Sequence, residues 1–271
     1  MKRILIGSPV HQKTAILQEF LNSLVNLDHE GLDLHYYFVD DNEEASSSAE
    51  LESFRNKHPN VRIEKNTEAE VYNEASHHWR TDVIEKVGKN KDKILHFARK
   101  NGFDFVFLAD SDLVLHPKTL THLVSLEKEV VSEVFWTAWT ENTMEMPQVW
   151  LYDEYGFTSD KKLTEEVKSQ KFFEFVTILK QKGVYPVGGL GACTMISKSA
   201  LEKGVLFERI YNLTFWGEDR HFCIRAAALN IQLFASTFYS PLHLYRDSDL
   251  ERVQAFWQAI KSGDANENEK N

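Results

Sequence analysis

The sequence predicts an α/β protein built on a mostly parallel central sheet, and two patterns indicate it. Short apolar stretches at 3–10, 32–43, 60–65 and 103–109 alternate with segments of helical periodicity. Acidic residues follow the apolar part of several of these stretches. Strands that alternate with helices form parallel sheets covered on both faces. Because ligands bind such sheets beyond the carboxyl ends of the strands, the acids indicate a site at that edge.

The elements of the first half follow from local signals. A Gly-Ser-Pro sequence interrupts the first apolar stretch, as suits a short buried strand. Apolar residues then recur at helical spacing from Ile16 to Leu24. Gly102 suits the C-terminal end of a helix. We expect further helices at 46–59, 81–102, about 161–182 and 215–230.

The second half is less regular. We expect a strand at 130–141, then a turn, a strand and a short helix across 184–204. A strand at 231–246 runs into a loop that contains a histidine. The polar tail at 263–271 is expected to be disordered. The chain has neither an internal repeat nor a Pro-rich or Gly/Ser-rich linker, so we expect one domain spanning 1–262.

Composition excludes some classes of protein. The formal net charge of the 271 residues is 31 − 41 = −10, whereas proteins that bind duplex nucleic acid have a basic surface. Cys193 and Cys223 lack a CxxC spacing, and we expect buried free thiols in a reducing compartment. No apolar stretch reaches about 18 residues, so we expect no transmembrane segment. The expected localisation is cytoplasmic, with docking on a membrane surface left open.

Two carboxylates stand at the end of the apolar stretch "FDFVFLADSDLVLHP". In an extended segment, Asp110 and Asp112 point to the same face and Ser111 points away. Neighbouring carboxylates repel each other and lose hydration together, so they need a partner. A divalent cation that also holds phosphate oxygens would be such a partner. A turn with solvated acids is the alternative interpretation.

Other chemistry-bearing residues lie in the second half. Glu218 and Asp219 open the helix at 215–230, where acids suit the helix dipole, or where one of them acts as a general base. His243 alone is more often structural, but with Asp112 and phosphate oxygens it would suit Mn²⁺.

The glycine-rich segment at 188–191 invites a phosphate-loop interpretation, but it lacks the Lys-Ser/Thr of a P-loop and does not complete GxGxxG. It indicates either a close backbone approach to a substrate or a tight turn. His77 and His78 lack a ligand pattern and are expected at the surface.

The order of these features resembles the GT-A glycosyltransferases, and most closely family 2, the inverting enzymes that use nucleotide sugars. The matching segments occur in the family's order and span residues 3–246. They are "GSPVHQ", "FVDDNE", "GKNKDKILHFARKNGFDFVFLADSD" with its DxD motif, "VGGLGACTMIS", "WGEDRHFCIRAAALN" and "PLHLYR". The resemblance implies a GT-A fold with a nucleotide-binding half at 1–112 and an acceptor and catalytic half at 113–262.

The resemblance also implies a role for each matching residue. In the donor site, Pro9 and Val10 would border the nucleoside, and Asp40 or Asp41 would hydrogen-bond the base or ribose. Asp110 and Ser111 would face the ribose and donor sugar, and the backbone from Gly189 through Gly191 to Ala192 would line that sugar. Asp112 would bind the metal, with His243 and Asp110 as further ligands. Asp219 would be the catalytic base, with Glu218 beside it in the acceptor pocket.

The chain departs from the family at one position. Members often carry Arg-Asn in the helix before the DxD motif, and Lys89-Asn90 stands here. Lysine meets a phosphate as a point charge and lacks the guanidinium fork, so the diphosphate contact of Lys89 is the weakest of these assignments.

The implied function is a metal-dependent glycosyltransferase of the hexosyltransferase type. It would move a sugar from a nucleoside-diphosphate sugar, with a UDP-sugar expected, to a hydroxyl of a glycan, glycoprotein or lipid-linked acceptor. Mn²⁺ or Mg²⁺ would neutralise the leaving diphosphate. A single base acting on the acceptor predicts inversion, as in inverting glycosidases.

Three alternatives stay open. They are a catalytically silent module that binds a nucleotide sugar or glycan, a sugar nucleotidyltransferase, and a retaining GT-A enzyme. The segment after the first strand is poor in the glycines and basic residues that a nucleotidyltransferase needs. Trp136, Trp139, Trp150 and Tyr152 would either stack on an acceptor sugar or fill the core, and we favour the core.

Overall fold

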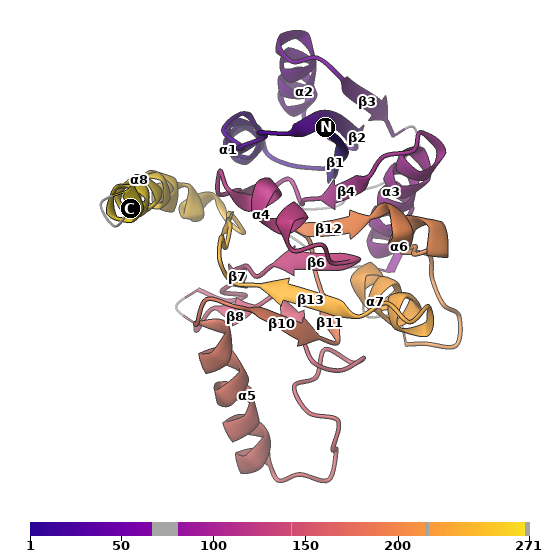
Figure 1. Cartoon of the computed structure of the whole chain (residues 1–271), viewed down its shortest axis with the longest axis vertical. Coiled ribbons are helices and arrows are strands. Elements are labelled where there is room, and N and C mark those ends of the chain that lie inside the picture. The colour runs from indigo at the N-terminus through magenta and orange to yellow at the C-terminus, as the bar shows by residue number, and fades with distance from the viewer. Residues whose placement is uncertain (67–80, 142, 215–216, 269–271) are drawn as a thin grey trace.

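The computed structural model describes residues 1–66, 81–141, 143–214 and 217–268. They form an eight-stranded central sheet with the order β10-β13-β6-β12-β4-β1-β2-β3, flanked by helices (Figure 1). His77 and His78 lie outside the described residues. Within the described part of the chain, none of the helices combines the length and apolarity needed to cross a membrane.

The N-terminal half forms the parallel part of the sheet that the sequence predicts. All four of its strands lie side by side in parallel register. They are β1 (Lys2–Val10), β2 (Leu32–Asp40), β3 (Val61–Lys65) and β4 (Phe105–Leu108). Their carboxyl ends therefore meet at one edge, where the acidic residues follow them.

The C-terminal half extends this sheet with strands of mixed direction. β12 is antiparallel to both β4 and β6, and β10 is antiparallel to β13. β13 and β6 are parallel and run in the same direction as the first four strands. The strands of this half are β6 (Val130–Glu133), β10 (Val184–Val187), β12 (Thr194–Ser197) and β13 (Leu233–Ser236).

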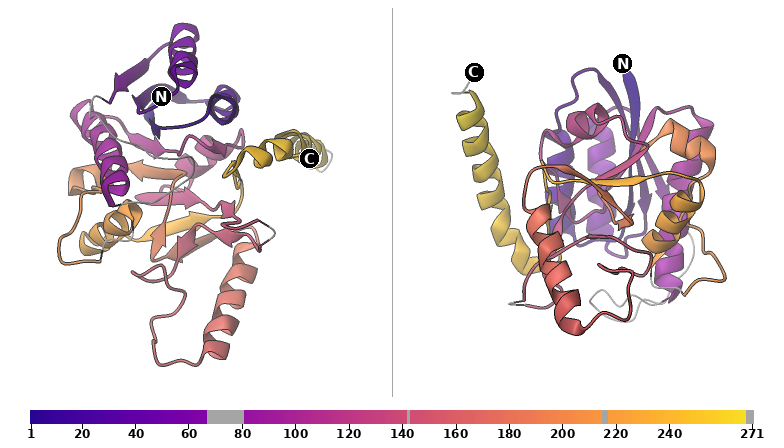
Figure 2. Two further views of the ribbon diagram at one scale, coloured as in Figure 1. Left: turned by 180° about the vertical axis from the view of Figure 1, so that it is seen from behind. Right: turned by 60° about the horizontal axis from the view of Figure 1, so that its bottom comes forward.

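Helices cover the sheet on both faces, and each face has its own apolar core. One core joins α1 (Thr14–Val25), α2 (Ala45–Lys57) and α4 (Thr119–Ser125) to the sheet. The other joins α3 (Thr81–Lys100), α6 (Lys198–Lys203), α7 (Glu218–Ala228) and α5 (Glu165–Leu179). The C-terminal segment, η1 (Asp247–Arg252) and α8 (Val253–Asn268), stands off to one side of the sheet (Figure 2).

Three short strand pairs supplement the sheet, and two of them hold proposed site residues. β5 (Leu113–Val114) pairs with β14 (Leu242–His243), and β9 (Val149–Trp150) pairs with β11 (Gly189–Leu190). The third pair is β7 (Trp136–Thr137) with β8 (Met146–Pro147). Such short pairs depend on long-range contacts, so local sequence patterns do not predict them.

Several boundaries differ from the sequence-based expectation. The strand expected at 130–141 is divided into β6 and β7, and the one at 231–246 into β13 and β14. The helix expected at 161–182 is confined to α5. Helix α8 extends to Asn268, into the tail that was expected to be disordered, and 269–271 lie outside the described residues. Gly102 has a φ of 66° just beyond α3, as expected for a helix C-terminus.

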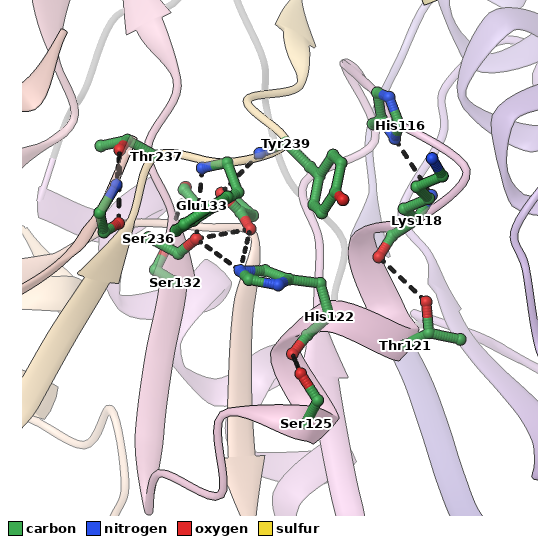
Figure 3. A network of polar contacts seen from close by, with 12 residues as sticks. His116, Lys118, Thr121, His122, Ser125, Ser132, Glu133, Ser236, Thr237 and Tyr239 are labelled. Carbon is green, nitrogen blue, oxygen red and sulfur yellow. Dashed lines mark hydrogen bonds and ion pairs between the residues drawn. The ribbon is translucent and has the colours of Figure 1, made fainter. Parts of the chain in front are cut away.

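A buried polar network joins the ends of β6 and β13 to α4 (Figure 3). The fully buried Glu133 accepts a 2.8 Å hydrogen bond from Ser236 Oγ and a 3.2 Å bond from the Tyr239 amide. His122 Nε2 lies 3.0 Å from Ser236 Oγ. Burial raises the pKa of Glu133 to about 7, although the hydrogen bonds from Ser236 and Tyr239 oppose the shift. Burial lowers the pKa of His122.

Candidate functional site

Four charged side chains from three parts of the chain meet at the carboxyl edge of the sheet. Lys91 comes from α3, Glu218 and Asp219 from the first turn of α7, and Asp110 from the segment after β4. Lys91 Nζ lies 2.8 Å from Glu218 Oε1, 3.2 Å from Asp219 Oδ1 and 3.8 Å from Asp110 Oδ1. The Lys91 and Glu218 side chains are 3% and 7% exposed, whereas Asp219 is 25% and Asp110 42% exposed. The two aspartates therefore form the solvent-facing part of this cluster.

Local sequence explains how these groups come together. Acids in the first turn of α7 are favoured by the helix dipole. Helix α3 can pass close to this turn because residue 88 is glycine. A Cβ atom at Gly88 would stand only 3.2 Å from Glu218 Cβ. The close packing of the two helices places Lys91, one turn further along α3, beside the acids.

The cluster changes the protonation of its members. Burial raises the pKa of Asp219 from 3.8 to about 7, with Lys91 opposing the shift and Glu218 and Asp110 adding to it. Burial also raises the pKa of Asp110 to about 6, but its exposed fraction lets solvent screen part of that effect. Burial disfavours the charged form of Lys91, yet Asp219 and Glu218 outweigh this and hold its pKa well above the usual value.

A second pair lies at the start of β5. His243 Nε2 is 3.2 Å from Asp112 Oδ2, and His243 Nδ1 is 2.8 Å from Thr137 Oγ1. The His243 and Asp112 side chains are 9% and 13% exposed. The β5–β14 pair sets this contact, because it aligns His243 with Leu113, the residue after Asp112. Burial alone would lower the pKa of His243, but Asp112 raises it above the usual value.

The donor set of this pair fits a divalent cation such as Mn²⁺. A carboxylate oxygen and an imidazole nitrogen are ligands that Mn²⁺ accepts. Among the described residues there is no group of three or more His, Cys, Asp or Glu side chains arranged to hold a metal. A cation here would therefore take its remaining ligands from water and from a bound phosphate, as is usual where proteins bind metal–nucleotide complexes.

The geometry expected for the DxD segment is wrong in one respect. Residues 111–112 form a turn two residues after the end of β4, with the Leu113 amide bonded to the Asp110 carbonyl at 3.2 Å. The alternation of an extended strand therefore does not apply. Asp110 approaches Lys91 while Asp112 approaches His243, so the two carboxylates have different partners. Ser111 between them is buried.

The residues expected to bind the nucleoside lie at the ends of β1 and β2. Pro9 and Val10 close β1, and the Asp41 amide bonds the Val10 carbonyl at 2.8 Å. Asp40 is buried, and its Oδ1 accepts bonds from the Asn42 side chain at 2.8 Å and from Ser48 at 3.1 Å.

Asp41 Oδ1 lies 2.7 Å from Nζ of the buried Lys86. Of the two neighbouring acids, Asp41 is the more exposed, since the side-chain exposure is 12% for Asp41 and 5% for Asp40. This favours Asp41 over Asp40 as the group that could meet a ligand.

The glycines at 188–191 serve close packing within the chain. A Cβ atom at Gly188 would lie 2.1 Å from the Leu151 carbonyl oxygen, and one at Gly189 would lie 1.9 Å from the Trp150 ring. The close approach is therefore to Trp150 of β9 and to the backbone that follows it, and neither a substrate nor a tight turn is needed to explain these two glycines. At Gly191 a Cβ atom would meet Asp219 Oδ2 at 3.5 Å, an ordinary contact. Gly191 thus lies beside the proposed base.

The lysine that reaches the acidic cluster is Lys91, whereas Lys89 is exposed. Sequence reasoning missed Lys91, and it also missed Lys86. A signal was present, because Lys91 occupies a position of the apolar stripe of α3 that includes Ile84, Leu95 and Ala98. A lysine on the buried face of a helix requires carboxylate partners.

The aromatic residues of the middle region divide into two groups. Trp150 is 6% exposed and packs against Tyr155 at a ring distance of 4.4 Å, so it belongs to the core. Trp136 is partly buried against the same core. Trp139 and Tyr152 are 47% and 39% exposed and remain available to a ligand. Cys193 and Cys223, both within the described residues, are buried free thiols as predicted.

Comparison with solved structures shows which class of protein has this fold. The S. aureus protein TarS, as its fragment 1–349, matches with a TM-score of 0.51 and 18% identity over 88% of this chain and 60% of that one. The same fragment in complex with UDP-GlcNAc matches at 0.51 and 16%, over 89% and 57%. The mannosyltransferase PcManGT from Pyrobaculum calidifontis, in complex with GDP-Man and Mn²⁺, matches at 0.51 and 12%, over 87% and 55%. The fold is that of the GT-A glycosyltransferases.

A comparison of the sequence with models of protein families identifies the family. The model of glycosyl transferase family 2 matches residues 6–205, most of the chain, and the protein belongs to this family. The chain spans about 60% of the TarS fragment that it matches. No curated protein sequence matches the chain.

Proposed function

We propose that this glycosyltransferase moves a sugar from a UDP-sugar to an acceptor hydroxyl, with a divalent cation and with inversion. The observation that carries the proposal is the arrangement at one edge of the sheet. The Asp112–His243 pair, Asp110 and the Lys91–Asp219 pair all gather where β1, β2 and β4 end. This edge is where parallel α/β sheets bind their ligands.

The donor would lie across the ends of these strands. Pro9, Val10 and Asp41 would contact the nucleoside, and Asp40 would support Asp41 from within the core. Asp110 and Ser111 would face the ribose and donor sugar, with the backbone from Gly189 to Ala192 beside them. The choice of uridine rests on the TarS neighbour, which was crystallised with UDP and with UDP-GlcNAc. Lys89 is exposed on α3, and its contact with the diphosphate stays the weakest of the proposed donor contacts.

Asp112 and His243 would hold the cation together with the diphosphate, and Asp110 would add a ligand if it turned from Lys91. When bound, the cation would neutralise negative charge on the diphosphate as it leaves. Mn²⁺ is the first choice because imidazole is among the ligands, and Mg²⁺ is the second.

Asp219 would act as the general base. Its carboxylate would take the proton of the acceptor hydroxyl as the acceptor oxygen bonds to the anomeric carbon. The bond from that carbon to the diphosphate breaks and its electron pair leaves with the diphosphate. A single displacement of this kind inverts the anomeric configuration. Glu218 is buried against Lys91 and would support Asp219.

The acceptor would be a glycan, glycoprotein or lipid-linked sugar. The exposed rings of Trp139 and Tyr152 are suited to stack on a sugar face. We further propose a cytoplasmic enzyme that meets acceptors in solution or at a membrane surface.

Thermal unfolding with UDP, GDP, CDP and dTDP, each with and without Mn²⁺, tests the donor site. A ligand that binds only the folded state raises the unfolding midpoint by mass action. We expect UDP to raise it in the presence of Mn²⁺, and Asp112→Asn to abolish the dependence on Mn²⁺. If no nucleotide raises the midpoint at millimolar concentration, the donor site is wrong. If the nucleotide binds but UDP-GlcNAc and GDP-Man are never turned over, the silent binding module replaces the enzyme.

A further inference from the structure

The two oxygens of the Asp219 carboxylate lie in different surroundings. Oδ1 is 3.2 Å from the ammonium group of Lys91. Oδ2 lies beside Gly191, 3.5 Å from the place where a Cβ atom of that residue would stand. Because residue 191 has no side chain, the space next to Oδ2 is not filled from that position. One oxygen is therefore occupied by a cation, while the other faces the glycine-rich segment.

Lys91 is itself held in place. Its side chain is 3% exposed, and its Nζ contacts Glu218 Oε1 at 2.8 Å and lies 5.1 Å from the centre of the Phe207 ring. The next residue, Asp92, accepts a 2.7 Å hydrogen bond from the Phe207 amide. Helix α3 is thus fixed to the segment that precedes α7. A buried lysine with these contacts has little rotamer freedom, so it can fix the group that it binds.

We propose that Lys91 is a positioning residue for the base, holding Asp219 Oδ1 so that Oδ2 points toward the acceptor hydroxyl. The inference deepens the proposed function and rests on it. The lysine does not touch the reacting atoms, and it acts through Asp219. In the reaction Oδ2 takes the acceptor proton, while the ammonium group stays paired with Glu218 and Oδ1.

The balance of charge at Asp219 explains why a cation is needed. Among the described residues, the charged or titratable groups that face it are Lys91 from α3, Glu218 and Cys223 from α7, Asp110 after β4 and Tyr155 from the loop before α5. Lys91 is the cation among these groups. Without it, Glu218 and Asp110 would repel the Asp219 carboxylate. That carboxylate would then turn toward solvent or take up a proton, and in either case would cease to act as a base.

The test compares Lys91→Met with Lys91→Arg, and uses Lys93→Met as a matched control from the same helix. Lys93 is 38% exposed and lies 3.8 Å from Glu64, away from the acidic cluster. The readouts are Mn²⁺-dependent UDP release from UDP-GlcNAc and UDP affinity by calorimetry. Loss of an oriented base costs about 100-fold or more. We therefore expect kcat to fall about 100-fold in Lys91→Met, with less than about a threefold change in the Kd for UDP. Lys91→Arg should restore most of kcat, and Lys93→Met should match the wild type.

Two results would overturn the inference. The first is a Lys91→Met enzyme whose kcat is unchanged. The second is one whose affinity for UDP falls as far as its kcat, since Lys91 would then bind the diphosphate. If Lys91→Met does not fold, the double variant Lys91→Met/Glu218→Gln removes one of the repelling carboxylates, and it should fold with the same low kcat.

A crystal structure of each variant separates this inference from the proposed function. Even if the wild type turns over no donor, Lys91→Met should show the Asp219 carboxylate rotated away from Gly191. An unchanged Asp219 orientation would refute the positioning role whether or not the enzyme is active.

Discussion

Thr137 illustrates how one side chain can orient a neighbour for the role that we propose for it. Its hydroxyl lies 2.8 Å from His243 Nδ1, on the opposite side of the ring from Asp112. When Nδ1–H donates to this hydroxyl, Nε2 carries the free lone pair and faces Asp112. A hydrogen bond on the far ring nitrogen is the usual way in which a protein fixes a metal-binding histidine. Thr137 is itself 2% exposed, so its own position is fixed by packing.

We therefore expect Thr137→Val to weaken Mn²⁺ binding about 10-fold. Titration of Mn²⁺ in the presence of UDP, followed by electron paramagnetic resonance of the free ion, measures this directly. Thr137→Ser keeps the hydroxyl and should bind Mn²⁺ as the wild type does. Equal affinity in the valine variant would show that His243 does not depend on this contact.

The pKa of Asp219 predicts how activity depends on pH. A base acts only in its ionised form, and burial raises the pKa of Asp219 to about 7. We expect kcat/KM for donor turnover to rise with pH up to about 7 and to level off above it, because kcat/KM reports the free enzyme. Asp219→Asn should abolish transfer at every pH. A profile that is flat between pH 5 and 8 would contradict the assignment of Asp219 as the base.

At the scale of elements, the β9–β11 pair holds the glycine-rich segment beside α7. The glycine-rich segment can lie this close to Trp150 and Leu151 because residues 188 and 189 have no side chains. A Cβ atom at Gly188 would lie 2.1 Å from the backbone oxygen of Leu151, and backbone atoms cannot move aside as a flexible side chain can. The pair in turn places Gly191 next to Asp219. Packing in this short pair therefore controls the geometry of the site.

Gly188→Ala should consequently destabilise the protein by about 1–3 kcal/mol, the usual cost of overpacking. Gly263→Ala is the matched control, since Gly263 lies in α8 with nothing within 4 Å of its Cβ position. Alanine is the better helix former by up to about 1 kcal/mol, so this variant should be unchanged or slightly stabilised. Urea unfolding of both variants gives the comparison. A Gly188→Ala protein as stable as the wild type would mean that β9 can move away without cost.

At the scale of the whole molecule, the network around Glu133 couples folding to pH (Figure 3). The pKa of Glu133 rises from 4.5 in the unfolded chain to about 7 in the folded protein. Between these values the folded state binds more protons, so this residue makes stability fall as pH rises. The shift corresponds to about 3 kcal/mol, lost in full above pH 7. His122 has a lowered pKa and acts in the opposite direction below its usual value.

Glu133→Gln should remove the larger of these two effects. We expect the free energy of unfolding of the wild type, minus that of the variant, to decrease by up to about 3 kcal/mol from pH 4.5 to pH 7. The slope of this difference against pH is the informative quantity. Its absolute value is less so, because glutamine also changes the hydrogen bond from Ser236 or Tyr239. His122→Gln serves as the control for the opposing titration. Parallel curves for wild type and Glu133→Gln would show that Glu133 is ionised at all these pH values in the folded protein.

The sequence by itself determined the parallel half of the fold and pointed to the acidic residues of the candidate site. Strand and helix periods are local properties, and the acids at 110, 112, 218 and 219 can be identified from the motifs that contain them. The tertiary structure alone decided the partners of these acids. Lys91 and Glu218 are 127 positions apart, and Thr137 and His243 are 106 apart. The direction of β12 was likewise decided by its pairing with β4 and β6, which brings the two halves of the chain together. Contacts across such separations depend on how the sheet is assembled, and no local period or spacing encodes them.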